Sequence, residues 1–147
     1  MDRIITDIDK LKTHCELISC PIEAKEIADE LFKVLAKTDN AIGLAANQIG
    51  IDKSVCVVNV TRPLWFANPI FIGGFDKILY KESCLSFPDS EIQTIRYKNI
   101  FVLADNLNEE MAFGPQNILE CVCVQHEICH LSGETMFDHE YTKTDKQ

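Results

Sequence analysis

The stretch Gln125-His126-Glu127-Ile128-Cys129-His130, near the carboxyl end of the 147-residue chain, contains the most informative residues of the sequence. Residues four apart on an α-helix share one face, so His126 and His130 can direct both imidazoles at one metal ion. Glu127 leaves the helix about 100° around from His126, a direction suited to holding a water molecule bound to that metal. The H-E-x-x-H pattern therefore predicts two metal ligands and a base. Because the same spacing also arises by accident on amphipathic helices, the rest of the chain has to supply a third ligand, an oxyanion partner and a pocket.

Composition narrows the class of protein. A chain of 147 residues, with 46% hydrophobic and 25% charged residues, is typical of a soluble globular domain with a sizeable core. The net charge of −9 argues against a nucleic-acid-binding surface, which would need a basic stripe. The first residues do not resemble a signal peptide, and no apolar run approaches membrane-spanning length. We therefore expect one domain over residues 1–147, with neither a nucleic acid nor a membrane as partner.

The cysteines indicate a reducing compartment. There are seven of them, an odd number at irregular spacings. In a secreted domain they would suggest disulfides, but without a signal segment they are more typical of reduced thiols. We expect a cytoplasmic protein in which most cysteines are small core residues.

Hydrophobic periodicity and turn residues divide the first two thirds of the chain into segments. Pro21 suits the first turn of a helix, and apolar residues then follow helical spacing to about Lys37. The small residues of 41–50 indicate a tightly packed loop whose backbone can approach a ligand closely. Strand-like segments are found at 54–60, at 65–72 with an interruption at Pro69, and at 75–80, 92–96 and 100–104.

The last third predicts a hairpin followed by the metal-binding helix. Residues 106–109 form a turn that returns through residues 111–113. Gln116 or Asn117 starts the final helix, and Gly133 ends it. Because many strands precede one late helix, we expect an α+β fold, mostly antiparallel sheet packed on that helix.

A catalytic metal typically has three protein ligands and one open position, so the two histidines need a partner. In protease-type sites the third ligand often lies shortly downstream, but the longer H-E-x-x-H-x-x-G-x-x-H pattern fails because Met136 stands where its last histidine belongs. Glu134, His139 and Glu140 remain as downstream alternatives. The other alternative is Cys84, expected in a turn rather than within a strand, since a thiolate with two imidazoles makes a tetrahedral site with room for water.

Three stretches of the chain together resemble the peptide deformylases. The first motif of that family, Gly-x-Gly-x-Ala-Ala-x-Gln, is similar to Ala41-Ile42-Gly43-Leu44-Ala45-Ala46-Asn47-Gln48. The second, Glu-Gly-Cys-Leu-Ser, is similar to Glu82-Ser83-Cys84-Leu85-Ser86. The third, Gln-His-Glu-x-Asp-His-Leu-x-Gly, is similar to Gln125-His126-Glu127-Ile128-Cys129-His130-Leu131-Ser132-Gly133. The three occur in the order and at the separations of the family, so the resemblance is specific and covers most of the chain.

The resemblance implies an enzyme that hydrolyses the formyl group from the N-terminal methionine of newly made polypeptides and releases formate. It implies that Cys84, His126 and His130 bind one divalent metal, most often Fe²⁺, with Zn²⁺, Ni²⁺ or Co²⁺ as substitutes. Such a metal lowers the pKa of its bound water and polarises the formyl oxygen. Glu127 would take the proton of the water and later deliver it to the leaving amine.

Further residues and partners follow from the same resemblance. The side-chain amide of Gln48 and the backbone N–H of Leu85 are expected to hold the developing oxyanion. The expected partners are N-formyl-Met polypeptides, including nascent chains near the ribosome. A pocket for the methionine side chain is expected from residues of the first two motifs and of the final helix before the third motif, some of which are equally consistent with ordinary core: Ile42, Gly43, Ser83, Leu119, Val122 and Cys123.

Four positions depart from the family pattern. Ala41 and Ser83 replace glycines and are expected to narrow the substrate cleft. Cys129 replaces an acidic residue beside a metal ligand, and Glu91 stands where many relatives carry arginine. Three alternatives therefore stay open, namely a metalloprotease with a downstream ligand, a structural zinc module closed by Cys129, and a non-catalytic metal-binding descendant of the fold. The intact metal, base and oxyanion positions favour the enzyme.

Overall fold

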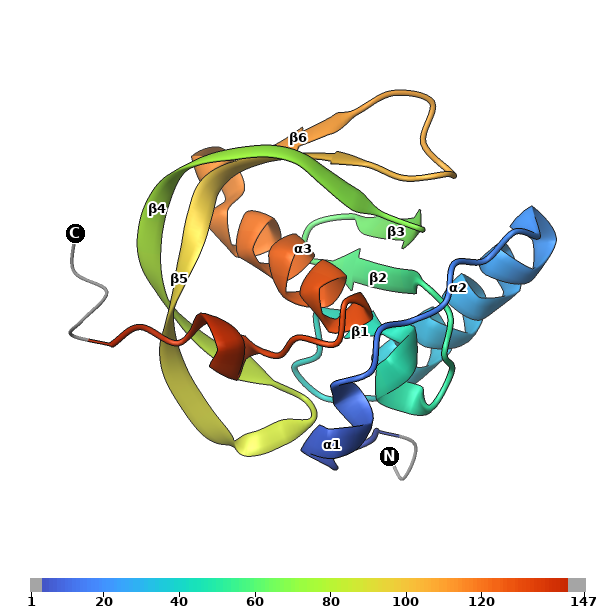
Figure 1. Ribbon diagram of the computed structural model, residues 1–147, viewed down its shortest axis with the longest axis horizontal. Helices are drawn as coiled ribbons and strands as arrows, with labels where there is room; N and C mark the ends of the chain where they lie inside the picture. The colour runs from blue at the N-terminus through green and yellow to red at the C-terminus, as the bar shows by residue number, and fades with distance from the viewer. Residues whose placement is uncertain (1–3, 143–147) are drawn as a thin grey trace.

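The computed structural model describes residues 4–142 and places two three-stranded antiparallel sheets around one helix (Figure 1). The first sheet has the order β1-β2-β3 and the second the order β4-β5-β6. The elements are α1 (Ile8–Leu11), α2 (Pro21–Ala36), β1 (Gly43–Ala45), η1 (Ala46–Ile49), β2 (Val55–Asn59), β3 (Pro63–Ala67), β4 (Ile70–Cys84), β5 (Phe87–Leu103), β6 (Met111–Phe113), η2 (Pro115–Asn117), α3 (Ile118–Leu131) and η3 (Met136–His139).

The first sheet is buried on both faces because a helix packs on each. Alternate residues of a strand point to opposite faces, and β2 is apolar throughout its buried part. Val55 and Val57 join the core formed with α2, whereas Cys56 and Val58 join the core formed with α3. This continuous apolar run is the reason why residues 54–60 are recognisable as a buried strand from sequence.

Helix α3 occupies the space between the two sheets and is almost wholly buried (Figure 1). Asn117 caps it by accepting a hydrogen bond from the backbone N–H of Glu120. Gly133 follows its end with a φ of 79°, and a Cβ there would lie 2.5 Å from the carbonyl oxygen of Lys12. Only glycine fits this left-handed position without strain, so the predicted end of the helix is confirmed.

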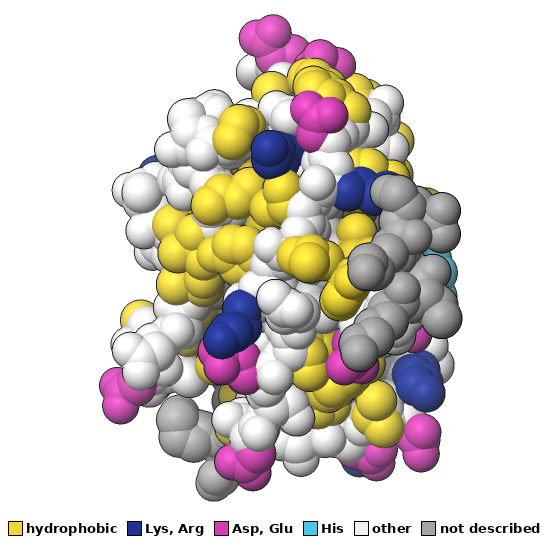
Figure 2. Space-filling model, turned by 90° about the vertical axis from the view of Figure 1, so that its left-hand side faces the viewer, with side chains coloured by type: hydrophobic (Ala, Val, Ile, Leu, Met, Phe, Trp, Pro, Cys, Tyr) yellow, Lys and Arg dark blue, Asp and Glu magenta, His cyan; other side chains and the backbone are white. Residues whose placement is uncertain are grey.

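The long hairpin of β4 and β5 forms most of the second sheet and bends around α3 (Figure 1). It replaces four separate strand-like segments of the sequence prediction, and the expected break at Gly73-Gly74 is a register shift within β4. Strand β4 exposes several apolar side chains: Ile70, Phe71, Ile72, Phe75 and Leu79. Figure 2 shows hydrophobic side chains gathered on the surface of the side of the molecule where β4 and β5 lie. This exposure obscures the alternation by which a strand is recognised.

The predicted α+β class, with antiparallel sheets and a late helix, is confirmed, as are the helix beginning at Pro21 and the return strand at 111–113. The prediction of a loop over residues 41–50 was wrong, because this segment forms β1 and the 3₁₀ helix η1. Asn47 of η1 donates its side-chain N–H to the backbone carbonyl of His130 at 2.6 Å. The small residues therefore let two elements pack closely on α3. No helix among residues 4–142 is long and apolar enough to cross a bilayer.

Candidate metal centre and active site

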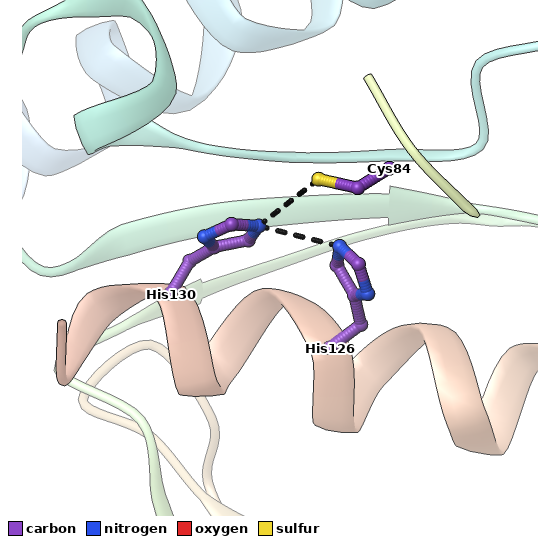
Figure 3. A group of neighbouring side chains, drawn as sticks. All are labelled: Cys84, His126 and His130. Carbon is purple, nitrogen blue, oxygen red and sulfur yellow. Dashed lines mark hydrogen bonds between the residues drawn. The ribbon is translucent and has the colours of Figure 1, made fainter. Parts of the chain in front are cut away.

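Three donor atoms converge at the buried face of α3 (Figure 3). The Nε2 atoms of His126 and His130 lie 3.2 Å apart, and Cys84 Sγ lies 3.4 Å from His130 Nε2. Ligands around a tetrahedral divalent ion with bonds of about 2.0–2.3 Å lie about 3.3–3.8 Å from one another. Two imidazoles and one thiolate at these separations fit a single divalent metal and leave its fourth position open.

Cys84 is the last residue of β4, and it enters the centre from the opposite wall to α3. It pairs with Phe87 across a two-residue turn formed by Leu85 and Ser86. The sequence predicted a turn rather than a strand here, and the correction is small, because the strand ends at the cysteine itself. The tight turn fixes the thiol at the edge of the sheet, where it faces the helix.

A buried carboxylate holds His126 in position. Glu82 Oε1 accepts a hydrogen bond at 2.8 Å from Nδ1 of His126, which leaves Nε2 free to bind a metal. Arg96 in turn donates to both oxygens of Glu82 through Nε and Nη2. Burial opposes ionisation, but the hydrogen bonds from His126 and Arg96 lower the pKa of Glu82 to about 2. Glu82 is therefore an anion that orients the histidine.

Glu127 projects into the same site without a partner for one of its oxygens. Its Oε1 is buried and makes no hydrogen bond to any residue of the described range 4–142. Burial raises the pKa of this carboxyl to about 7, with the nearby His126 opposing the shift. A carboxyl that titrates near neutrality and has a free oxygen is suited to general acid–base chemistry.

Gln48 presents its side-chain N–H groups to the centre. Its Oε1 accepts the backbone N–H of Ala45 at 2.9 Å, which fixes the orientation of the amide. Nε2 then lies 3.1 Å from Ser86 Oγ and 3.7 Å from Cys84 Sγ. The amide is thus a donor aimed at the space beside the metal ligands. Leu85, in the turn next to Cys84, lines the same space.

A cavity of about 690 Å³ opens at these residues. It is lined by Cys84, Gln48, His126 and Glu127, but not by His130. Every residue predicted for the substrate pocket also lines it: Ile42, Gly43, Ser83, Leu119, Val122 and Cys123. Val122 and Cys123 are buried, and Leu119 is partly exposed at the rim. The cavity also reaches residues 4, 6 and 38–40, which the sequence did not indicate.

The alternative ligands lie elsewhere. Glu134 and His139 form a separate group with Cys129 and do not approach the two helix histidines. Glu140 lies in an isolated bridge with Thr94. This arrangement gives no support to a downstream third ligand of the protease type or to a centre closed by Cys129.

Sequence reasoning missed Arg96 and gave Glu82 no role beyond its place in a motif. Arg96 lies within β5, where nothing in its neighbourhood distinguishes it from a surface arginine. Position 129 could have indicated this arginine, because Arg96 Nη1 lies 3.8 Å from Cys129 Sγ. The acidic residue that the family carries at this position would have suggested a basic partner, whereas the neutral Cys129 does not. Ser86, which meets Gln48, was also missed.

Comparisons with known proteins identify similar chains. The family model for polypeptide deformylase matches residues 1–146. Peptide deformylase 1 of Vibrio vulnificus (strain YJ016) is 32% identical over 135 residues, which cover 88% of this chain and 80% of that protein. The peptide deformylase of Aquifex aeolicus (strain VF5) is 33% identical over 123 residues, covering 79% of this chain and 72% of that one.

Solved structures are similar in fold. A probable peptide deformylase from Synechococcus phage S-SSM7 is 31% identical with a TM-score of 0.81, covering 92% of this chain and 97% of that chain. The peptide deformylase of Thermotoga maritima has a TM-score of 0.86 at 24% identity and covers 95% of this chain and 97% of that chain. The two sheets around a central helix therefore recur in these proteins.

Proposed function

The chain belongs to the peptide deformylase family, metal-dependent hydrolases that deformylate nascent polypeptides, and we propose that Cys84, His126 and His130 hold its catalytic metal while Glu127 is its base. The observation that carries this assignment is the convergence of three donor atoms beside a buried carboxylate oxygen without a partner in the described part of the chain. A divalent cation bound there supplies Lewis acidity, which lowers the pKa of water and polarises the formyl oxygen.

Glu127 carries the proton through the reaction. In its ionised form, one carboxylate oxygen accepts a proton from the water molecule that attacks the formyl carbon. The same oxygen then donates this proton to the amine as the bond between carbon and nitrogen breaks, so that formate and a free amino terminus are released. The pKa of about 7 suits both halves of this transfer, because the group is neither a weak base nor a weak acid at neutral pH.

Gln48 and Leu85 stabilise the charge that develops on the formyl oxygen. The Gln48 amide oxygen accepts from Ala45, so the direction in which Nε2 points is already fixed before the charge appears. The backbone N–H of Leu85 is the second donor in this proposal, supported by its place in the turn that also carries Cys84. Loss of one such donor typically lowers the rate by about 10²–10³.

The methionine side chain would occupy the apolar part of the cavity beside α3. Val122 and Cys123 lie one turn before the histidines, and Ile42 and Gly43 face them from β1 and the residue before it. An unbranched apolar side chain suits such walls, because they offer few polar partners. Leu119 and Ser83 lie along the same cavity and would contact the residue from the rim.

We also propose Fe²⁺ as the native metal, with Zn²⁺, Ni²⁺ or Co²⁺ as substitutes, on the strength of the family resemblance and the mixed imidazole and thiolate donors. A cytoplasmic location near the ribosome is proposed for the same reason, supported by cysteines that are all free. The decisive experiment is formate release from a formyl-Met tripeptide after anaerobic loading with each metal. Metal-dependent formate release is expected, and its absence with every metal would refute the proposal.

A further inference from the structure

A second group of metal-ligating side chains lies at the carboxyl end of α3, apart from the catalytic centre. Cys129, Glu134 and His139 each offer one ligand atom, and these atoms all lie within 4.8 Å of one another. Cys129 precedes His130 by one residue, which turns its side chain about 100° around the helix from the catalytic face. The three residues line a cavity of about 450 Å³ that the proposed reaction does not use.

We propose that Cys129, Glu134 and His139 form a second, zinc-binding site. A thiolate, an imidazole and a carboxylate are the donor types that zinc takes in proteins, and three of them leave one position for water. The proposal concerns a site independent of deformylation, and it stands or falls without any assignment of the catalytic residues.

The backbone already brings the three ligands together. The backbone N–H of Glu134 donates to the carbonyl of Cys129 at 3.0 Å, so the chain turns back directly after α3. Thr135 then starts η3 by accepting the N–H of Phe137 at 3.2 Å and donating its own N–H to Asp138 at 2.9 Å. This short turn fixes His139 relative to Glu134. The ion would thus be held by a preformed loop with little loss of chain entropy.

The side chains are poised for the exchange of a proton for a metal. His139 Nε2 lies 2.8 Å from Glu134 Oε1, and Cys129 Sγ offers its ligand atom within 4.8 Å of both residues' ligand atoms. The hydrogen bond between His139 and Glu134 joins two groups whose lone pairs a cation would use. Separations of about 3.3–3.8 Å around a tetrahedral zinc require shifts of about 1 Å in these distances. Side-chain exposures of 47% for Glu134 and 31% for His139 leave a path for the ion.

The local charges balance when the ion is bound. Arg96 Nη1 lies 3.8 Å from Cys129 Sγ, and its charge would oppose a cation if it were unpaired. Both Glu82 oxygens accept from Arg96, so that charge is already neutralised within the protein. The remaining charges are those of the Cys129 thiolate, the Glu134 carboxylate and a divalent ion, which sum to zero. Neutralisation of the cluster offsets part of the cost of removing these charges from water at a half-buried position.

The first test isolates the second site in a Cys84→Ser background, which removes the thiolate of the catalytic centre. Cobalt(II) is the probe, because a thiolate bound to it gives a charge-transfer absorption that oxygen and nitrogen ligands do not. The Cys84→Ser chain is expected to retain this absorption at one cobalt per chain, and Cys84→Ser/Cys129→Ser to lose it. Cys84→Ser/Cys20→Ser is the matched control, since Cys20 is an exposed cysteine outside both groups, and it should keep the absorption. Absorption that survives the loss of Cys129, or none in Cys84→Ser, overturns the proposal.

The second test leaves the catalytic centre intact. After equilibrium dialysis against zinc, the unmodified chain is expected to hold two ions and His139→Ala one. His139 is partly exposed, so its removal spares the fold. The same zinc content in both chains overturns the proposal, whereas the loss of one ion on His139→Ala supports it. A failure here with formate release intact refutes the second site alone, whereas lost formate release with zinc still bound at Cys129 refutes the catalytic assignment alone.

Discussion

Glu82 and His126 are joined by a hydrogen bond of 2.8 Å between two side chains that come from the opposite walls of the site. The carboxylate accepts from Nδ1 and so directs Nε2 toward His130 and Cys84. It is also the buried partner of Arg96, with side-chain exposures of 4% and 2%. One residue therefore links the stability of the second sheet to the orientation of a metal ligand.

Glu82→Gln is expected to lower both the stability of the protein and the affinity of the centre for its metal. It leaves Arg96 as a buried cation without a carboxylate, a change that typically costs about 3–5 kcal/mol of unfolding free energy. Loss of the partner of a ligating histidine typically lowers metal affinity about 10- to 100-fold. Urea unfolding and competition with a chelator measure the two effects. Glu16→Gln is the matched control, because Glu16 pairs with Lys53 at the surface, where solvent screens the pair and its loss should change stability little. A Glu82→Gln chain as stable as this control would show that the buried pair is not structural.

Cys84→Ala is expected to remove the metal that supports catalysis, because only two imidazoles remain to hold it. Formate release and metal content after dialysis are measured together, and formate release should fall to background with the loss of one ion per chain. Cys20→Ala should retain both, since Cys20 lies at the surface before α2. An unchanged metal content in Cys84→Ala would mean that the cysteine is not a ligand.

Cys129→Asp is expected to keep formate release or to raise it. The side chain lies 3.8 Å from Arg96 Nη1, and a carboxylate there gains a charged hydrogen bond that a thiol supplies weakly. Firmer placement of Arg96 holds Glu82, and through it His126. The ratio kcat/KM for a formyl-Met tripeptide is the measurement. Loss of the catalytic metal in this variant would place Cys129 among its ligands and contradict the assignment.

The sequence predicted the chemical groups of the site better than the strand pairing that positions them. His126, Glu127 and His130 are encoded within five residues of one helix, so helical geometry alone brings them together. Cys84 is 42 positions earlier than His126, and only a motif, not a spacing rule, connects it to the helix. The Glu82–Arg96 pair depends on the register of β4 against β5. The sequence does not reveal this register, because β4 exposes apolar residues and has an irregularity before Gly73.

Gly43→Ala tests how little space the base has. A Cβ at Gly43 would lie 2.6 Å from Glu127 Oε2 and 2.7 Å from Cys123 Sγ, so Glu127 must move. A displacement of about 1 Å at a catalytic group can lower the rate about 10²-fold, and a fall in kcat of this size with the metal retained is expected. Gly73→Ala is the control, because its Cβ would meet only Phe101 at 3.3 Å, far from the cavity that contains Glu127. Equal kcat values in the two variants would show that the base tolerates the shift.

Glu127→Gln separates metal binding from proton transfer. Glutamine keeps the size of the side chain and its ability to hydrogen-bond, but it has no basic oxygen for the proton of the water. General acid–base assistance is typically worth about 10²–10⁴ in rate, so kcat should fall by that factor while the metal content and the binding of a formyl-Met peptide persist.

The pH dependence of kcat/KM in the wild-type and Glu127→Gln proteins supplies the control. Burial raises the pKa of Glu127 to about 7, and a bound cation lowers it, so wild-type kcat/KM should fall tenfold per pH unit below a midpoint at or under this value. The base works only when deprotonated, which gives the limb its sign, and the residual activity of Glu127→Gln should lack it. Loss of the metal in this variant would make Glu127 a ligand, and full formate release would assign the proton transfer to another group.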